Sequence, residues 1–357
     1  MSVKSQSAGQ SRSLLDFLGS FWAWIFLLLL IVIFSISNPV FLSPFNLQNI
    51  LANMAILTII AMGQTFVIIA AGIDLSAGWV MGMVSVVAAL ALNSMPPGTP
   101  LWITLTVALL IGASAGLVAG LVNGLLIARL NVPPFIATLG MFGIARGVAF
   151  LLSGGMPIPV RTEGLGRIGN GYLFYFHPTA GWSFFTPPEG LAQADMRQLL
   201  GVFPNAVLLM LVLLLIAHIV LSRTRFGLHT YAVGGNKEAA LRAGIPVSRT
   251  LIAVYMTSAL CAAFAGVLYG SRFTNGAANA GEALLLDSIA AVVIGGASLF
   301  GGAGSVIGTL IGALIIAVLS NGLVILNINP FWQFIAVGVV IIIAVLIDQA
   351  REKFIQS

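Results

Sequence analysis

The chain has 357 residues, of which 59% are hydrophobic and only 7% are charged, and its mean hydropathy is +1.08. Soluble domains carry about a quarter charged residues, so this composition excludes an ordinary soluble protein and indicates a polytopic membrane protein. The net charge is +5, but no basic run with interleaved aromatic residues occurs, so nucleic acid is not expected as a partner. The single cysteine, Cys261, excludes a disulfide framework and a thiolate metal site.

Apolar runs of about 17 to 25 residues recur along almost the whole chain, and each is long enough to cross about 30 Å of hydrocarbon. Shorter alternating segments, typical of a β-barrel, are not seen. We therefore expect an all-α transmembrane bundle in a single domain, 1–357. The ten predicted spans are 18–37, 50–71, 75–93, 101–128, 135–152, 202–221, 250–271, 283–300, 304–326 and 331–348.

Basic residues indicate the orientation of these spans. If the N-terminus is cytoplasmic, ten of the fifteen Lys and Arg residues lie in cytoplasmic loops or tails. The positive-inside rule supports that orientation, and an even number of spans then places both termini in the cytoplasm. The first apolar run is too long for a signal peptide and is followed by no cleavage site, so we expect a retained helix.

Two parts of the chain resemble each other. Asn123-Gly124-Leu125 is followed by Pro134-Phe135, and Asn321-Gly322-Leu323 is followed by Pro330-Phe331, with offsets of 198 and 196 residues. These pairs fall five spans apart, so the second copy runs in the opposite direction through the membrane. The pattern predicts an inverted repeat of spans 2–5 and 7–10, as in many transporters.

Glycines recur at every fourth position in spans four and nine. Such spacing places them on one face of a helix, where a second helix can approach closely. The stretch GGASLFGGAGSVIG lacks the lysine of a nucleotide-binding loop and follows no soluble strand, so helix packing and a tight turn are expected there. The glycines are Gly112, Gly116, Gly120 and Gly124 in span four, and Gly304, Gly308 and Gly312 in span nine.

The loop 222–249 is the most polar patterned segment. Asn236 is a suitable N-cap, Glu238 and Arg242 are an i,i+4 pair, and Gly244 with Pro246 ends the pattern. A short helix of about two turns is therefore expected. It is either a solvated connector or a docking element. The docking role is suggested because so short a helix needs a partner surface to be stable.

The segment 153–201 is expected outside the membrane, because it is too polar and too interrupted by Pro and Gly to span. It is a lid, a docking surface for an external protein, or a packed insertion. The three histidines lie far apart, and no Ser, His and acid trio stands out. Neither a catalytic site nor a metal site is predicted.

Three charged residues lie within or beside apolar runs, where a charge is costly. Asp74, in the stretch AGIDLSAG, either N-caps the helix expected to begin at Leu75, or borders a solute path or transmits a movement. Arg146 and Asp287 raise the same question. A carboxylate partner is expected for Arg146, and the sequence does not identify it.

Four motifs together resemble the ribose-type permeases of bacterial ABC monosaccharide importers, over about residues 40–350. They are GIDLSAG, NGLLIARLNVPPFIATLGMFGIARGVAFLLSGGMPI, TRFGLHTYAVGGNKEAALRAGI and LDSIAAVVIGGASLFGGAGSVIGTLIGALI. The resemblance implies a multi-pass permease subunit of the bacterial cytoplasmic (inner) membrane, embedded in lipid. It would pair with a second copy or a sister permease. The segment 153–201 is longer than the resemblance leads us to expect.

The same resemblance implies a division of labour among subunits. A cytoplasmic ABC ATPase would bind ATP and Mg, so no cofactor is expected in this chain, and a periplasmic sugar-binding protein would deliver the solute. In loop 222–249 the resemblance implies a coupling helix contacting the ATPase through Lys237, Glu238, Ala239, Ala240, Arg242 and Gly244.

A sugar offers only hydroxyl groups, so we expect a weakly polar path. Candidate residues for the path or its gate are Asn53, Gln64, Thr65, Asp74, Asn123, Thr138, Arg146, Asp287 and Asn321.

Two other functions remain open. A gradient-driven secondary transporter would need an acid and base that cycle with protons or sodium, and Asp287 with Arg146 could serve. Alternatively, the ABC assembly could carry a branched-chain amino acid, a nucleoside or a signalling furanose. A membrane enzyme is less favoured, because the sequence shows no catalytic constellation.

Overall fold

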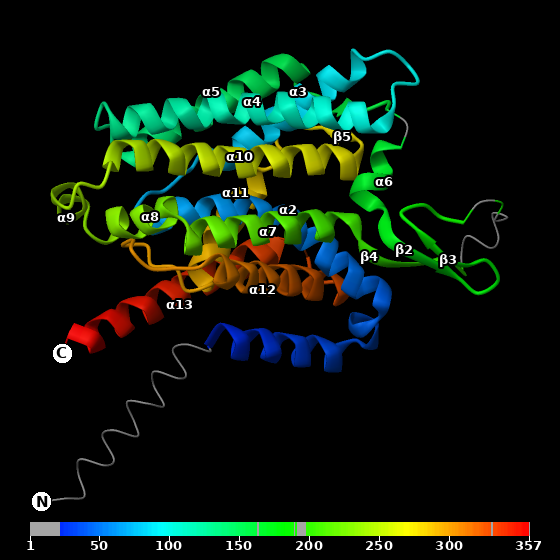
Figure 1. Cartoon of the computed structure of the whole chain (residues 1–357). Helices are drawn as coiled ribbons and strands as arrows, with labels where there is room; N and C mark the ends of the chain where they lie inside the picture. The colour runs from blue at the N-terminus through cyan, green and yellow to red at the C-terminus, as the bar shows by residue number, and fades with distance from the viewer. Residues whose placement is uncertain (1–21, 163, 189, 191–197, 330, 357) are drawn as a thin grey trace, which may run out of the picture.

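The protein is described from a computed structural model that covers residues 22–162, 164–188, 190, 198–329 and 331–356. Long helices lie side by side in one bundle, and a small antiparallel sheet projects from one end of it (Figure 1). The predicted helical membrane bundle is therefore confirmed. Residues 18–21 of the first predicted span lie outside the described residues.

Ten described helices follow the ten predicted apolar runs: Trp22–Ser37, α2 (Pro44–Ile69), α3 (Ala77–Asn93), α4 (Leu101–Ala128), α5 (Pro134–Ser153), α7 (Asn205–Arg223), α10 (Val247–Phe273), α11 (Glu282–Ile294), α12 (Val306–Ile325) and α13 (Phe331–Gln356). By length and composition, six of the described helices can cross a membrane: α2, α4, α5, α7, α10 and α12. The count of ten spans stays a prediction.

The predicted eighth span, 283–300, is too long. Helix α11 ends at Ile294, and the chain then turns through Gly296 (φ +87°), Gly301 (φ +88°) and Gly302 (φ +74°) before α12 begins. These left-handed conformations are open to glycine at little cost and end a helix. A β carbon on Gly308 would overlap the carbonyl of Gly295, so the glycine-rich stretch forms the turn and the close helix contact that the sequence predicts.

The glycine face of α4 packs against α10. A β carbon added to Gly116 would lie 2.7 Å from the carbonyl oxygen of Ala259, and one added to Gly120 would lie 2.6 Å from that of Tyr255. Backbone therefore meets backbone along this seam, which requires residues without side chains on one side. The predicted role of the four glycines of span four is confirmed.

Helices α3 and α11 begin at the same place within the bundle. Gly78 lies in the first turn of α3 and Gly281 directly precedes α11, and a β carbon on either would overlap the carbonyl oxygen of the other. Both helices are short, with 17 and 13 residues. Each is shorter than the long helices α2, α4 and α10, and their N-terminal ends meet at these two glycines.

The segment 153–201 departs from the all-α prediction. After the short strand β1 (Ile158–Pro159), which pairs with β5 (Asn275–Gly276), and helix α6 (Leu165–Asn170), strands β2 (Tyr172–His177), β3 (Gly181–Phe184) and β4 (Leu200–Pro204) form an antiparallel sheet in the order β3-β2-β4. Cross-strand aromatic pairs such as Phe174 and Phe184, whose ring centres are 5.2 Å apart, stabilise it. The two-residue alternation of these aromatic side chains is a strand signal that the sequence prediction missed.

Candidate functional site

The carboxylate of Asp74 lies at the start of α3 and is buried. Its Oδ1 accepts hydrogen bonds from the backbone N–H of Ser76 at 2.9 Å and from the Ser76 hydroxyl at 2.6 Å. Its Oδ2 accepts one from the hydroxyl of Ser258 on α10, at 2.7 Å. The helix begins at Ala77 and not at Leu75, Ser76 occupies the N-cap position, and no side chain caps the helix. The predicted N-cap role of Asp74 is therefore wrong, and its carboxylate instead bonds the residue at the N-cap position. It also ties the turn to α10.

Other predicted residues gather around the same turn. Gln64 on α2 donates to the backbone carbonyl of Asp74 at 2.6 Å, and Asn123 on α4 donates to the Ser76 hydroxyl at 3.0 Å. Thr138 on α5 donates to the carbonyl of Ile73 at 3.2 Å. All three side chains are buried. The turn 70–76 is thus hydrogen-bonded to α2, α4, α5 and α10.

The structure places the remaining amide and hydroxyl candidates elsewhere. Thr65 shares a hydrogen bond of 2.7 Å with Thr309 of α12, and Asn321 forms a reciprocal amide pair with Asn46 of α2, at 2.9 and 3.0 Å. Asn53 accepts from Arg272 at 2.8 Å. These contacts join helices, and the structure does not bring these three candidates together with Asp74.

Arg146 and Asp287 are not paired. In the part of the chain that the structure describes, no carboxylate lies within 4.0 Å of Arg146. Its guanidinium instead lies over the ring of Trp79, 4.9 Å from the ring centre, in a cation–π contact. The expectation of a carboxylate partner is therefore wrong for the described residues, and an aromatic ring takes that place.

Asp287 lines a cavity of about 470 Å³ between α11, the turn before it and α13. Its side chain is 7% exposed, and no hydrogen-bond donor among the described residues contacts its carboxylate. The other lining residues are Asn279, Glu282, Ala283, Leu286, Phe334, Val337 and Gly338. Among the described residues, no cluster of three or more His, Cys, Asp or Glu side chains could hold a metal ion.

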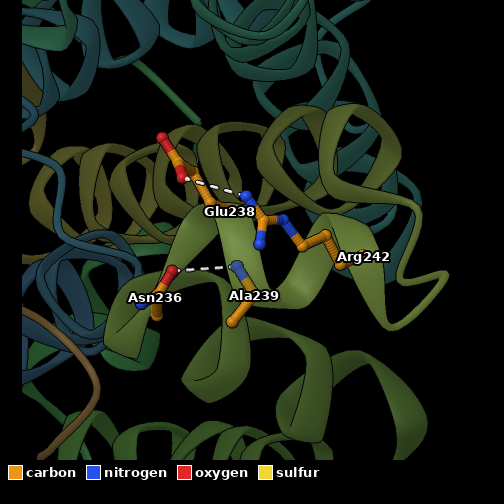
Figure 2. Close-up of polar contacts among 4 residues, drawn as sticks. All are labelled: Asn236, Glu238, Ala239 and Arg242. Atoms are coloured by element: carbon orange, nitrogen blue, oxygen red, sulfur yellow. Dashed lines mark hydrogen bonds and ion pairs between the residues drawn. The ribbon is translucent and has the colours of Figure 1, made fainter.

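The loop 222–249 contains the short helix that its sequence predicts. Helix α9 spans Lys237–Arg242, and the side chain of Asn236 accepts from the N–H of Ala239 at 2.9 Å (Figure 2). Gly244 ends it at φ +79°. Glu238 and Arg242 are 4.0 Å apart, with side chains 87% and 84% exposed. Such an exposed pair contributes little to stability. The helix is therefore stabilised mainly by its N-cap and by the surfaces that pack against it.

A second helix, α8 (Arg225–Gly235), supports α9 and was not predicted. A β carbon on its Gly234 would overlap the carbonyl of Ile69, which also accepts from the N–H of Gly302 at 2.8 Å. The hydroxyl of Tyr231 donates to the carbonyl of Gly304 at 2.7 Å, and burial raises the pKa of this tyrosine, so the donor stays protonated. Helix α8 therefore contacts both the end of α2 and the turn between α11 and α12.

Comparisons with known proteins identify the family. Residues 46–345 match the family of permease components of branched-chain amino acid transport systems. The chain belongs to this permease family.

The permease is 39% identical to the ribose import permease protein of Bacillus subtilis (strain 168), over 96% of this chain and 95% of the relative. It is 36% identical to the galactose/methyl galactoside import permease protein of Escherichia coli (strain K12), over 97% of this chain and 100% of the relative. The xylose transport system permease protein of the same strain is 34% identical, over 89% of this chain and 88% of the relative. No solved structure is significantly similar to the permease.

Proposed function

We propose that this chain is the membrane-spanning permease subunit of an ATP-driven importer that translocates a monosaccharide delivered by an external binding protein. Its likeness to ribose and galactose import permeases along almost its whole length carries the proposal. A cytoplasmic ABC ATPase supplies the ATP and Mg chemistry, and a second copy or a sister permease completes the translocation unit. The chain itself is a transport component.

Helix α9 is the proposed contact for the ATPase. Its exposed residues include Lys237, Glu238 and Arg242, together with an apolar side chain, Leu241, that is 66% exposed. Helix α8 carries a displacement of α9 to the end of α2 and to the turn between α11 and α12, through the backbone contacts described above. These two segments lead to Asp74 and to α11, so we expect closure of the ATPase to move α3 and α11 together.

The arrangement of the bundle supports ten spans and an inverted repeat. In each of the sets α2–α5 and α10–α13 the second helix is the shortest of the four, and these two helices, α3 and α11, meet at Gly78 and Gly281. The loop with α9 and the sheet β3-β2-β4 lie at opposite ends of the bundle, and the C-terminus lies at the α9 end (Figure 1). We assign the α9 end and both termini to the cytoplasm of a bacterium, and the sheet to the outside.

The candidate path residues separate into two groups. We assign Asp74, Gln64, Asn123 and Thr138 to a bonded turn that moves with the gate. Asp287 faces a cavity and is the better candidate for contact with solute. That the remaining candidates, Asn53, Thr65, Arg146 and Asn321, line the solute path stays a prediction.

The test has two arms on the tagged chain in its native membrane. Purification in a mild detergent, with the bound proteins identified by mass, is expected to recover an ATP-binding subunit. Uptake of labelled ribose, xylose and galactose is measured in cells with and without the gene. Uptake that stops when an uncoupler is added at constant ATP would instead favour a gradient-driven transporter. If unlabelled amino acids or nucleosides compete with the uptake of the labelled sugar, the cargo of the importer is not a monosaccharide alone.

A further inference from the structure

The cavity between α11 and α13 has the size and the composition of a small-molecule site. Its volume of about 470 Å³ lies within the range of about 300–1,000 Å³ that is usual for ligand pockets. Three of its lining residues are polar, Asn279, Glu282 and Asp287, and the others are apolar or glycine. A mainly apolar wall with a few convergent polar groups is typical of a binding site.

Asp287 is the residue that points to a ligand. It is 7% exposed, lines the cavity, and receives no hydrogen bond or ion pair from the described residues. Buried polar groups are normally paired, because an unpaired one loses its hydration without compensation. The Asp287 carboxylate therefore lacks a donor, and an occupant that supplies O–H or N–H groups would provide one.

The remaining lining residues favour a neutral polyhydroxy compound. A carboxylate accepts several hydrogen bonds at once, and the amide of Asn279 both donates and accepts. The ring of Phe334, 57% exposed, gives an apolar surface for the C–H face of a sugar ring. A bare metal cation would not need so large a cavity or an apolar wall. We infer that this cavity is a transient binding subsite for a sugar, in which Asp287 accepts hydrogen bonds from the sugar hydroxyls; the inference rests on the proposed function.

Ala283 offers a direct test by thiol labelling. It is exposed on α11 and lines the cavity, and the only native thiol, Cys261, lies within α10. Ala283→Cys is treated with a small water-soluble thiol reagent in native membranes that hold the full assembly, with ribose, xylose or galactose as the probe. At ten times its dissociation constant a sugar leaves about one site in eleven free, so labelling is expected to slow about tenfold.

The same labelling is repeated with Asp287→Asn added to Ala283→Cys, and protection is expected to disappear at the same sugar concentration. Labelling that is unchanged by a sugar that the cells take up would overturn the subsite and leave the proposed function intact. Labelling slowed by sodium and not by sugar would make the cavity a cation site, and failure of the reagent to label the Ala283→Cys variant would mean that lipid fills it. Uptake of the three sugars that is the same with and without the gene, together with no ATP-binding subunit bound to the purified chain, would overturn the proposed function itself.

Gly338 allows the cavity to be filled without disturbing the fold. It lines the cavity on α13, and a β carbon added there meets no atom within 4 Å. Gly338→Leu is expected to lower sugar uptake about tenfold or more by excluding a bound hydroxyl from Asp287, and Gly338→Ala to lower it much less. The matched control is Gly143→Leu on α5, where a β carbon also meets nothing within 4 Å. Equal uptake by the two leucine variants, at equal amounts in the membrane, would contradict the subsite.

Discussion

Adding a side chain at Gly116 should separate α4 from α10. A β carbon there would lie 2.7 Å from the carbonyl oxygen of Ala259 and 2.9 Å from the β carbon of Ala263, whereas ordinary contact begins at 3.4 Å. The helices must therefore move apart by the difference between 3.4 and 2.7 Å, 0.7 Å, or the backbone must distort. Overpacking of this kind costs about 1–3 kcal/mol. Gly116→Ala should be measurably less stable, and Gly116→Leu should fail to assemble.

The assay is size-exclusion chromatography of the detergent-solubilised chain after heating, which gives an apparent Tm for each variant. Gly147 on α5 is the matched control, because a β carbon there meets no atom within 4 Å. Gly147→Ala and Gly147→Leu are expected to retain the Tm of the parent chain. If Gly116→Leu survives heating as well as Gly147→Leu does, the close approach of α4 to α10 is wrong.

Three other changes test other parts of the molecule. Glu238→Lys should leave membrane insertion intact and abolish uptake, because the exposed ion pair with Arg242 contributes little to the helix and the changed charge faces the proposed partner; normal uptake would argue against the coupling role. Ser258→Ala removes a donor to a buried carboxylate and should cost about 1–3 kcal/mol in an apparent stability measurement. Thr257→Ala, whose hydroxyl bonds only its own helix, should cost little, and equal losses in the two would refute the assignment. Asn321→Ala leaves the amide of Asn46 on α2 without its reciprocal hydrogen bond and should lower the Tm. The loss should be smaller when Asn46 has already been changed to alanine. Losses that simply add would mean that the two residues are not coupled.

The sequence predicts the local features of this fold well. Apolar runs place the helices because length and hydropathy are local properties, and the i+4 spacing of Gly116 and its neighbours predicts a close helix contact without identifying α10. The cap at Asn236 and the stop at Gly244 are also local. What is missed is α8 and the sheet, whose signals are a Thr224 cap and a two-residue alternation of aromatic side chains.

Contacts between distant residues account for the remaining differences. Ser258 lies 184 residues from Asp74, and nothing in the apolar run around it indicates that its hydroxyl meets a carboxylate. Arg146 has an aromatic ring as its partner because α5 packs beside α3. A rule that pairs opposite charges does not predict such a partner. The cavity at Asp287 depends on the placement of α13 relative to α11. Such features follow from tertiary packing and have no local pattern.

The meeting of α3 and α11 at Gly78 and Gly281 has an electrostatic consequence. Each helix N-terminus carries about half a positive charge from its aligned peptide dipoles, so two such ends held together repel each other in a medium of low dielectric constant. One carboxylate is placed at each end: Asp74 accepts from the N–H of Ser76, and Glu282 lies in the first turn of α11. Neutralising either carboxylate leaves the partial positive charge of its helix end uncompensated. The repulsion between the two N-termini then favours separation of the helices.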